Sequence, residues 1–441
     1  MKITLMSIGS TGDVRPTMQL GKELKSRGHE VTLAAFEPFE KMVRDAGLNF
    51  FLVRGNIIEM MNRVMKPGSV GFGYLPQLEK ALGEVWPDML ADLTASCKDA
   101  DALGCNFFGT VFYSIAEKFN IPCVQYQLFP MDPNETAPVA AAPGQNLGKL
   151  WNMTTYRVAY LLIGLVEHRY LADWRKANGL SQRKLQAHPN YQLGNHTIPV
   201  IYAISPLVFP RSKGWGEHIH MSGFWWDEKP ADFAPPKELE EFLAAGEKPI
   251  YIGFGSMNSG DMNRTLTIVL RAIRAAKLRA VIATGWSGQQ MRMHSTRNVF
   301  FADYVPHDWL FPRVRAVVHH GGAGTTAAGL RYGKPTLVIP FGGDQPFWGN
   351  RIFKTGCGPK PVPRNSMTVQ KLTKALIMLT TKDQYRVAAE ELADSLNAEH
   401  GTKKAADLLE KEILAWKEAD KKETDHEGLQ KDFLTSEIKK N

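Results

Sequence analysis

The chain has 441 residues, which is longer than one ordinary hydrophobic core and favours two domains. Its content of 44% hydrophobic and 22% charged residues excludes a wholly disordered protein. The 53 basic and 45 acidic residues give a net charge of +8, which favours anionic partners such as nucleotide phosphates or an acidic membrane surface; a basic surface without any partner fits equally well. Basic residues form no run interleaved with aromatic ones, so we expect no nucleic acid partner.

The cysteines and the N-terminus indicate in which cellular compartment the protein is expected. Four cysteines without a CxxC pair are typical of buried thiols in a reducing environment. The first residues lack the long apolar stretch of a signal peptide. The most apolar helical stretch, residues 158–166, is shorter than the roughly 20 residues that a membrane-spanning helix needs. We therefore expect a cytoplasmic protein, and peripheral contact of this stretch with a membrane is an open hypothesis.

The first half alternates strand-like and helix-like segments, which predicts a parallel, doubly wound sheet. Pro16 suits the first turn of a helix, and Gly28 suits its end. Residues 130–200 interrupt the alternation and are typical of an insertion that shapes a binding pocket. The expected strands are 2–8, 30–36, 101–108 and 122–129, with a turn at 9–13 and helices at 16–27 and near 110–119.

A second alternating block follows a polar, proline-rich segment that begins at residue 227. Its expected strands are 249–255, 280–285, 315–320 and 335–340, with a helix at 261–276 that Asp261 would cap. Beyond residue 381 we expect amphipathic helix to about residue 416 and then a frayed, charged tail. The predicted organisation is an N-terminal domain (1–226), a linker (227–248), a C-terminal domain (249–390), closing helices (391–416) and a tail (417–441).

The segment VVHHGGAGTTAAG, which starts at Val317, has the pattern of an anion-binding site. A β-branched strand ends in two histidines, and a Gly-Gly-Ala-Gly turn leads into a helix that contains Thr325. Glycines allow close approach of the backbone, and a helix start presents unpaired N–H groups and a dipole that favours negative charge. A purely structural tight turn would also use these glycines. The position between strand and helix favours phosphate binding.

Several segments resemble one family in order and spacing. The stretch from His319 to Gly349, which ends in PFGGDQPFWG, resembles the donor-binding signature of the sterol glucosyltransferase branch of the UDP-glycosyltransferases, a group that includes bacterial enzymes acting on antibiotic aglycones. SIGSTGDVRP near the N-terminus, GFGSM, ATGWSG and YVPHDWLFP match in the same order. The resemblance implies a GT-B fold, in which two Rossmann-like domains face each other across a cleft and the C-terminal helix, here around 402–416, returns to the N-terminal domain.

The resemblance also implies roles for individual residues in donor binding. His320, Gly322, Gly324 and Thr325 would hold the diphosphate, with Ser256 opposite. Val305 would contact the base through its backbone, Trp286 would bound the base pocket, and Asp344 and Gln345 would hydrogen-bond the sugar. Ser10, Thr11 and Gly12 belong to the matching N-terminal loop. Without the resemblance, a turn carboxylate after a strand is the preferred interpretation of Asp344.

Asp13 is the candidate general base. An inverting transfer requires one side chain that takes the proton of the attacking hydroxyl, while fixed donors stabilise the departing diphosphate without a metal. Asp13 follows a strand end, at the sheet edge where ligands of α/β proteins bind, and the related family has its base at this point of the motif. The alternative is a helix cap for the following helix.

The predicted function is therefore inverting transfer of a hexose, expected to be glucose, from a UDP-sugar to a hydroxyl of a hydrophobic acceptor such as a sterol or polyketide-like aglycone. We expect neither cofactor nor metal. TDP-sugars, used by the antibiotic relatives, remain open as donors. Rival interpretations are a nucleotide-sugar 2-epimerase, a non-catalytic nucleotide-sugar-binding protein and a nicotinamide oxidoreductase, although GSTGD at Gly9 is not the GxGxxG of the last. Aromatic and methionine residues at 72–74, 107–108, 153, 156 and 224–226 suit a flat acceptor or, alternatively, the core.

Overall fold

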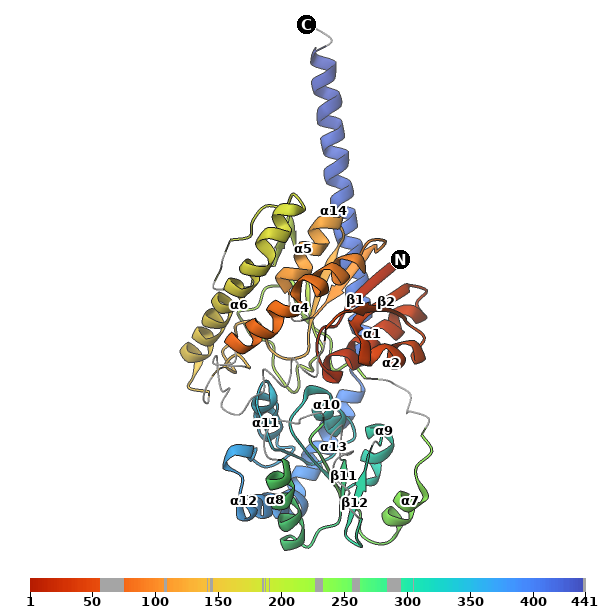
Figure 1. Ribbon diagram of the computed structural model, residues 1–441, viewed down its shortest axis with the longest axis vertical. Coiled ribbons are helices and arrows are strands. Elements are labelled where there is room, and N and C mark those ends of the chain that lie inside the picture. Colours follow the sequence, from red (N-terminus) through yellow and green to blue (C-terminus); the bar gives the residue numbers. More distant parts are fainter. Residues whose placement is uncertain are drawn as a thin grey trace.

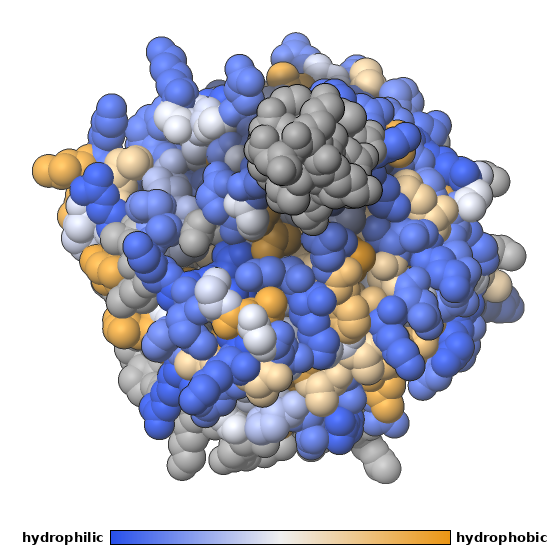
Figure 2. All heavy atoms as spheres, turned by 90° about the horizontal axis from the view of Figure 1, so that it is seen from above, coloured by the Kyte–Doolittle hydropathy of each residue, from blue (hydrophilic) through white to orange (hydrophobic). Residues whose placement is uncertain are grey.

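The computed structural model describes all residues except 56–74, 107–108, 141, 143–145, 185, 187, 190, 227–232, 256–261, 284–294, 304 and 439–441. Within the described part, two parallel sheets flanked by helices make up the two halves of the molecule (Figure 1). A short antiparallel hairpin, β6 (Gln192–Leu193) and β7 (His196–Thr197), accompanies them. Seen from above, the surface is largely hydrophilic, with scattered hydrophobic side chains (Figure 2).

The sheet of the N-terminal half has its first strand in an interior position. Its strands lie in the order β3-β2-β1-β4-β5-β8-β9, and all neighbours pair in parallel. β1 and β5 are almost continuously buried, as expected for strands covered on both faces. The strands are β1 (Lys2–Met6), β2 (Glu30–Phe36), β3 (Asn49–Val53), β4 (Ala102–Cys105), β5 (Cys123–Gln127), β8 (Val200–Tyr202) and β9 (Ile219–Met221).

The sheet of the C-terminal half repeats this arrangement in the order β12-β11-β10-β13-β14, again entirely parallel. In both sheets the chain starts in the interior, moves to one side and then crosses to the other. Ligands of such sheets bind beyond the carboxyl ends of the strands at this switch point. The predicted doubly wound architecture is confirmed. The strands are β10 (Ile250–Gly253), β11 (Ala280–Ala283), β12 (Val299–Ala302), β13 (Ala316–His319) and β14 (Thr336–Val338).

Helices cover both sheets (Figure 1). The N-terminal half contains α1 (Thr11–Ser26), α2 (Glu40–Asp45), α4 (Leu75–Ala95), α5 (Gly109–Phe119) and α6 (Lys149–Ala177). The later helices are α7 (Lys237–Ala244), α8 (Met262–Ala275), α9 (His307–Leu310), α10 (Ala323–Arg331), α11 (Gln345–Lys354), α12 (Val369–Thr381), α13 (Asp383–Asn397) and α14 (Gly401–Ile438). Short 3-10 turns occupy Glu37–Phe39, Phe311–Arg313 and Arg364–Ser366.

The first helix begins earlier than its sequence suggested. We expected residue 16 as the start, but α1 begins at Thr11, because Ser10 and Asp13 form a capping box that satisfies the first amides. Pro16 consequently lies inside the helix. In the same turn, the Thr17 hydroxyl donates a hydrogen bond to the Asp13 carbonyl (2.9 Å). The expected stop is correct, since Gly28 follows the helix with a φ of +88°.

Two segments expected to be irregular contain helix. Helix α7 lies within 227–248 and packs on β12, because its buried Leu239 and Phe242 give it an apolar side. Helix α14 continues to Ile438, where we expected a frayed tail; Lys, Glu and Ala in this segment favour helix over coil. Its end projects from the body of the molecule (Figure 1). The proposed cap Asp261 lies outside the described residues.

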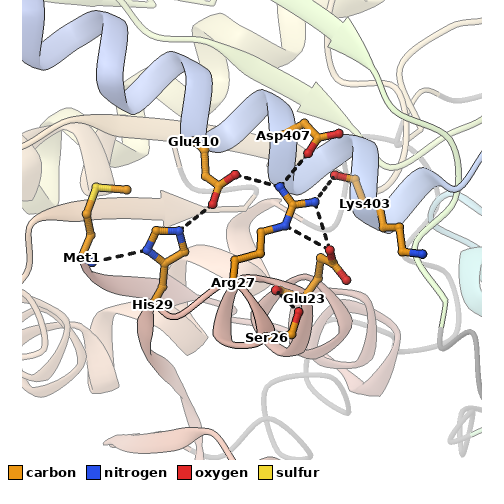
Figure 3. A network of polar contacts seen from close by, with 8 residues as sticks. All are labelled: Met1, Glu23, Ser26, Arg27, His29, Lys403, Asp407 and Glu410. Atoms are coloured by element: carbon orange, nitrogen blue, oxygen red, sulfur yellow. Dashed lines mark hydrogen bonds and ion pairs between the residues drawn. The ribbon is translucent and has the colours of Figure 1, made fainter.

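Helix α14 returns to the N-terminal half and packs in its core. Ala405, Leu409 and Ile413 are buried in the same cluster as β1 and α1. Around this contact, Arg27 donates to Asp407 (2.6 Å), Glu410 (2.7 Å) and the Lys403 carbonyl (3.1 Å), as Figure 3 shows. His29 meets the other oxygen of Glu410 at 2.6 Å. The chain end is thus fastened to the first helix by charge-assisted hydrogen bonds.

We expect Arg27→Met to lower the free energy of unfolding by about 1–3 kcal/mol, because it leaves the Asp407 and Glu410 carboxylates without their main donor. Urea unfolding measures the change. Lys41→Met is the matched control, since Lys41 and Asp45 form an ion pair whose side chains are 86% and 63% exposed. Equal stability of the two variants would show that the hydrogen bonds of Arg27 to α14 contribute nothing.

Candidate active site

Two helix N-termini lie close together where the halves of the molecule meet. Helix α1 starts beyond the carboxyl end of β1, and α10 starts beyond that of β13. The two helices contact each other. The chain thereby brings together the two loops that the sequence singled out, Gly9–Asp13 and His320–Thr325.

The start of α10 has the properties of an anion-binding site. Its N-cap residue is Gly322, so no side chain caps the helix. In the described part of the chain, no backbone or side-chain acceptor is found for the amides of Ala323 and Gly324. A side-chain carbon added to Gly324 would meet nothing within 4 Å. These donors and the helix dipole are therefore available to a negatively charged ligand. Thr325 is partly exposed in the same first turn.

His320 lies between two glycine turns. A Cβ on Gly322 would approach its Nε2 to 2.6 Å, and one on Gly255 would approach its Cε1 to 3.0 Å, so both positions require glycine for this ring placement. Burial lowers the pKa of His320 to about 4, while a hydrogen bond with the Gly253 backbone acts in the opposite direction. The ring is therefore neutral at pH 7 and acts as a hydrogen-bonding group. His319, fully buried, accepts from the Gly321 amide (2.9 Å) and shapes the turn.

The Asp13 carboxylate takes part in the cap of α1. Its Oδ2 accepts from the Ser10 amide (2.7 Å) and hydroxyl (3.1 Å), while the Ser10 hydroxyl accepts from Gly12 (3.2 Å). Burial raises the pKa of Asp13, and the Ser10 hydrogen bonds act in the opposite direction. A Cβ on Gly9 would collide with this carboxylate at 2.3 Å, so glycine makes room for it. Asp13 therefore has a structural role, and a raised pKa also makes its ionised form a stronger base.

Asp344 belongs to the C-terminal half but interacts electrostatically with Asp13. Burial raises the pKa of Asp344 to about 6, a hydrogen bond from Trp348 Nε1 (2.8 Å) lowers it, and the Asp13 charge raises it further. Asp13 and Asp344 therefore lie near each other, although 331 positions separate them in the sequence. Gln345 uses its side-chain oxygen within its own loop, where it accepts from Phe341 (2.7 Å) and Gly342 (3.3 Å).

The other predicted site residues divide into two groups. Ser256 and Trp286 lie outside the described residues. Thr11 opens α1, and Val305 has a buried side chain that packs with Tyr251 and Phe311, which leaves its backbone as the proposed contact. The predicted roles of the individual site residues remain predictions.

Two buried polar residues of the N-terminal half were not anticipated. Asn106 follows β4, which neighbours β1, and is 2% exposed, yet neither side-chain atom finds a partner in the described part of the chain. An unsatisfied buried amide costs about 1–3 kcal/mol, so a ligand hydroxyl here would be favoured. The sequence offered one signal, a polar residue just after a strand. The expected strand 101–108 included Asn106, so this signal was missed.

The second is Asp132, in the segment that follows β5. It accepts hydrogen bonds from Tyr191 and Tyr202 (2.6 Å from the latter), and the Tyr202 oxygen in turn accepts from the Met131 and Asp132 amides. Burial raises the pKa of Asp132 to about 6. This network fixes the backbone beside the carboxyl edge of the first sheet.

Some of the aromatic segments that the sequence suggested for an acceptor lie in the described part of the chain, and others do not. Residues 72–74 and 107–108 lie outside the described residues. Phe224 and Trp225 are core residues, and Tyr156 is buried, whereas Met153 is partly exposed on α6. For Phe224, Trp225 and Tyr156 the alternative of a core role is correct.

Among the described residues, no group of three or more histidine, cysteine, aspartate or glutamate side chains is arranged to hold a metal ion. None of the described helices combines the length and the hydropathy that a membrane crossing requires.

Comparison with solved structures identifies the architecture. The kitacinnamycin glycotransferase superposes with a TM-score of 0.68 at 20% identity, covering 93% of this chain and 98% of that one. The glycosyltransferase VinC, solved with DTDP, gives a TM-score of 0.65 at 18% identity, covering 94% and 100%. These similarities show the GT-B fold of glycosyltransferases, as the sequence predicted.

Comparison with known sequences identifies the family. Residues 3–137 match the Glycosyltransferase family 28 N-terminal domain, and residues 274–411 match the Erythromycin biosynthesis protein CIII-like, C-terminal domain. Two sterol 3-beta-glucosyltransferases of Arabidopsis thaliana are 33% and 32% identical over 95% and 94% of this chain, and the aligned part spans 66% and 68% of their length. It spans 27% of the Debaryomyces hansenii sterol 3-beta-glucosyltransferase, at 31% identity. This chain therefore belongs to the family of the sterol 3-beta-glucosyltransferases.

Proposed function

We propose that this protein is an inverting glycosyltransferase that moves glucose from UDP-glucose to a hydroxyl of a sterol or another flat, hydrophobic alcohol. The observation that carries the proposal is the uncapped start of α10 close to the Asp13 carboxylate of the other half. Family membership supports the reaction class, and the sterol relatives support the acceptor class. DTDP in VinC leaves a TDP-sugar as the second donor candidate.

The chemistry assigns one task to each half. The acceptor oxygen forms a bond to the anomeric carbon while the bond from that carbon to the diphosphate oxygen breaks. The acceptor proton passes to ionised Asp13, acting as general base. The charge that develops on the diphosphate is stabilised by the amides of Ala323 and Gly324 and by neutral His320 as hydrogen-bonding groups. This scheme requires neither a metal nor a cofactor.

The electrostatic interaction between Asp13 and Asp344 supports a division of labour between two carboxylates. Asp344, which accepts a hydrogen bond from Trp348, would also accept hydrogen bonds from sugar hydroxyls. Burial raises the pKa of Asp13. Asp13 is thereby a better proton acceptor than an isolated surface carboxylate.

The rival functions differ in their products. A nucleotide-sugar 2-epimerase would release a free, epimerised sugar from the donor alone, and a non-catalytic nucleotide-sugar-binding protein would bind the donor without turnover. A nicotinamide oxidoreductase would bind NAD instead of UDP. Incubation of the full chain with UDP-glucose and TDP-glucose, with and without a panel of sterols, flavonoids and macrolides, separates them. Acceptor-dependent release of UDP with formation of a β-glucoside supports the proposal, and release of free epimerised sugar without acceptor overturns it.

The donor site is tested by calorimetry with UDP. We expect His320→Ala to raise the Kd for UDP about tenfold, because it removes a neutral hydrogen-bonding group beside the diphosphate. His188→Ala is the control, since His188 is exposed and lies in the other half of the molecule. An unchanged Kd in His320→Ala would exclude His320 from the donor site.

A further inference from the structure

Helix α6 exposes a row of large apolar side chains. Leu150, Val158, Leu161 and Leu165 are 81%, 37%, 39% and 55% exposed, and Leu147, just before the helix, is 71% exposed. Their spacing places the four helical residues on one face. Five of the eleven large hydrophobic side chains that are exposed in the described part of the chain belong to this one segment. We call these five residues the α6 stripe.

Basic residues accompany the stripe. Lys149 and Arg157 are exposed and border it on the helix surface, and the only acidic residue between 149 and 172 is Glu167. The whole chain is also basic, with a net charge of +8. An apolar helix face with basic borders is the pattern of helices that lie in the plane of an anionic membrane surface.

The opposite face of α6 contacts the segment after β5. The Tyr156 hydroxyl accepts from Asn134 (2.7 Å), the Thr155 hydroxyl accepts from the Val139 amide (3.0 Å), and the Tyr160 hydroxyl donates to the Met131 carbonyl (3.1 Å). This segment leaves the carboxyl edge of the first sheet, the edge where α1 and Asp13 lie. One helix therefore connects the outer surface with the half of the molecule that contains Asp13, the proposed base for the acceptor hydroxyl.

The position of α6 suits a surface contact. The helix lies at the outside of the N-terminal half (Figure 1), and Figure 2 shows hydrophobic side chains at the rim on that same side, among hydrophilic ones. Since no described helix is apolar enough to cross a membrane, α6 would lie flat at the surface. A second copy of the chain fits less well, because a pairing of two stripes would place Lys149 and Arg157 in an interface where residues 149–166 offer no acidic partner.

We propose that the α6 stripe docks the protein on an anionic lipid surface, from which the hydrophobic acceptor enters the site. The proposal of a lipid surface as binding partner depends only on the stripe and on the basic residues beside it. The entry of the acceptor rests in addition on the proposed glycosyltransferase function.

The first experiment is flotation of the full chain with vesicles of phosphatidylcholine containing 30% phosphatidylglycerol, or of phosphatidylcholine alone. We expect the wild type to float with the anionic vesicles and the variant Leu150→Ser/Leu161→Ser/Leu165→Ser to lose at least about tenfold in partitioning, because three exposed leucines no longer enter the interface. Ile377→Ser/Val387→Ser/Leu414→Ser is the matched control, with three side chains that are 43%, 38% and 54% exposed on other helices. Lys149→Glu/Arg157→Glu should abolish the preference for anionic vesicles.

Equal flotation of the stripe variant and the wild type, or no flotation of the wild type, overturns the proposal. Sedimentation equilibrium tests whether a second copy of the chain covers the stripe instead. If the wild type is a dimer, the stripe variant is a monomer and neither binds vesicles, the stripe belongs to a dimer interface and the proposal is overturned. All variants replace exposed residues, and circular dichroism checks that they fold.

The second experiment separates docking from chemistry. With a sterol held in anionic vesicles, we expect the stripe variant to transfer glucose at least about tenfold more slowly than the wild type. With a water-soluble phenolic acceptor, the two should be equal. Equal loss with both acceptors would contradict acceptor entry through the stripe. Absence of any transfer by the wild type, together with intact flotation, would reject the proposed function and leave the docking surface standing.

Discussion

Asp13→Asn is expected to lower kcat by about two to four orders of magnitude while the Kd for UDP changes little, because a neutral amide cannot take the proton of the acceptor hydroxyl. The amide oxygen of asparagine still accepts a hydrogen bond from the Ser10 amide, so the capping box that Asp13 completes is largely preserved. Asp13→Ala removes both the base and the cap. Steady-state kinetics and thermal unfolding of the two variants separate the roles.

The outcomes are distinct. If Asp13 serves only as a cap, Asp13→Asn turns over at the rate of the wild type, and only Asp13→Ala loses stability, by about 1 kcal/mol. If Asp13 is the base, both variants lose turnover and only Asp13→Ala loses stability as well. Wild-type turnover in Asp13→Asn therefore eliminates the proposed base.

The same residue determines the acid side of the pH profile. Burial raises the pKa of Asp13, so its ionised, active form is lost as the pH falls through that raised value, and kcat/KM falls with it. The Asp13 charge raises the pKa of Asp344, so Asp13→Asn should lower the pKa of the Asp344 carboxyl, which an NMR titration measures. An unchanged pKa of Asp344 in this variant would show that the two carboxylates do not interact.

Gly324→Val is expected to raise the Kd for UDP at least about tenfold, which corresponds to about 1.4 kcal/mol. Gly324 is the second residue of α10, and the space around its missing side chain is open to 4 Å, so the valine fits without collision in the protein alone. Its side chain would occupy the approach to the first turn of the helix, where the diphosphate is proposed to bind.

The thermal stability should respond differently from the affinity for UDP. Glycine destabilises a helix interior by about 0.5–1 kcal/mol relative to alanine, so Gly324→Ala should not lower the melting temperature although it hinders the ligand. Gly214→Val is the control for UDP affinity, since Gly214 is exposed in the N-terminal half and an added side-chain carbon would meet only the Ser212 hydroxyl, at 3.8 Å. Equal affinities of Gly324→Val and the wild type would place the diphosphate elsewhere.

Much of the architecture was predictable because its signals are local. The strand at 316–319, its glycine turn and the following helix form a contiguous pattern, and the structure has them as β13, the turn and α10. The start of α1 was predicted five residues late, since Pro16 outweighed the Ser10–Asp13 capping box in the interpretation. The helix within 227–248 was missed because only two of its residues, Leu239 and Phe242, are buried.

The sequence by itself determined the two doubly wound halves and the glycine loop at a helix start, because strand alternation, turn residues and helix starts depend on neighbouring positions. Only the tertiary structure decided that Asp13 and Asp344 share one electrostatic environment, that Asn106 is buried without a partner, and that the apolar residues of α6 face outward. These properties depend on which distant segments pack together, and burial, desolvation and exposure arise only when they do.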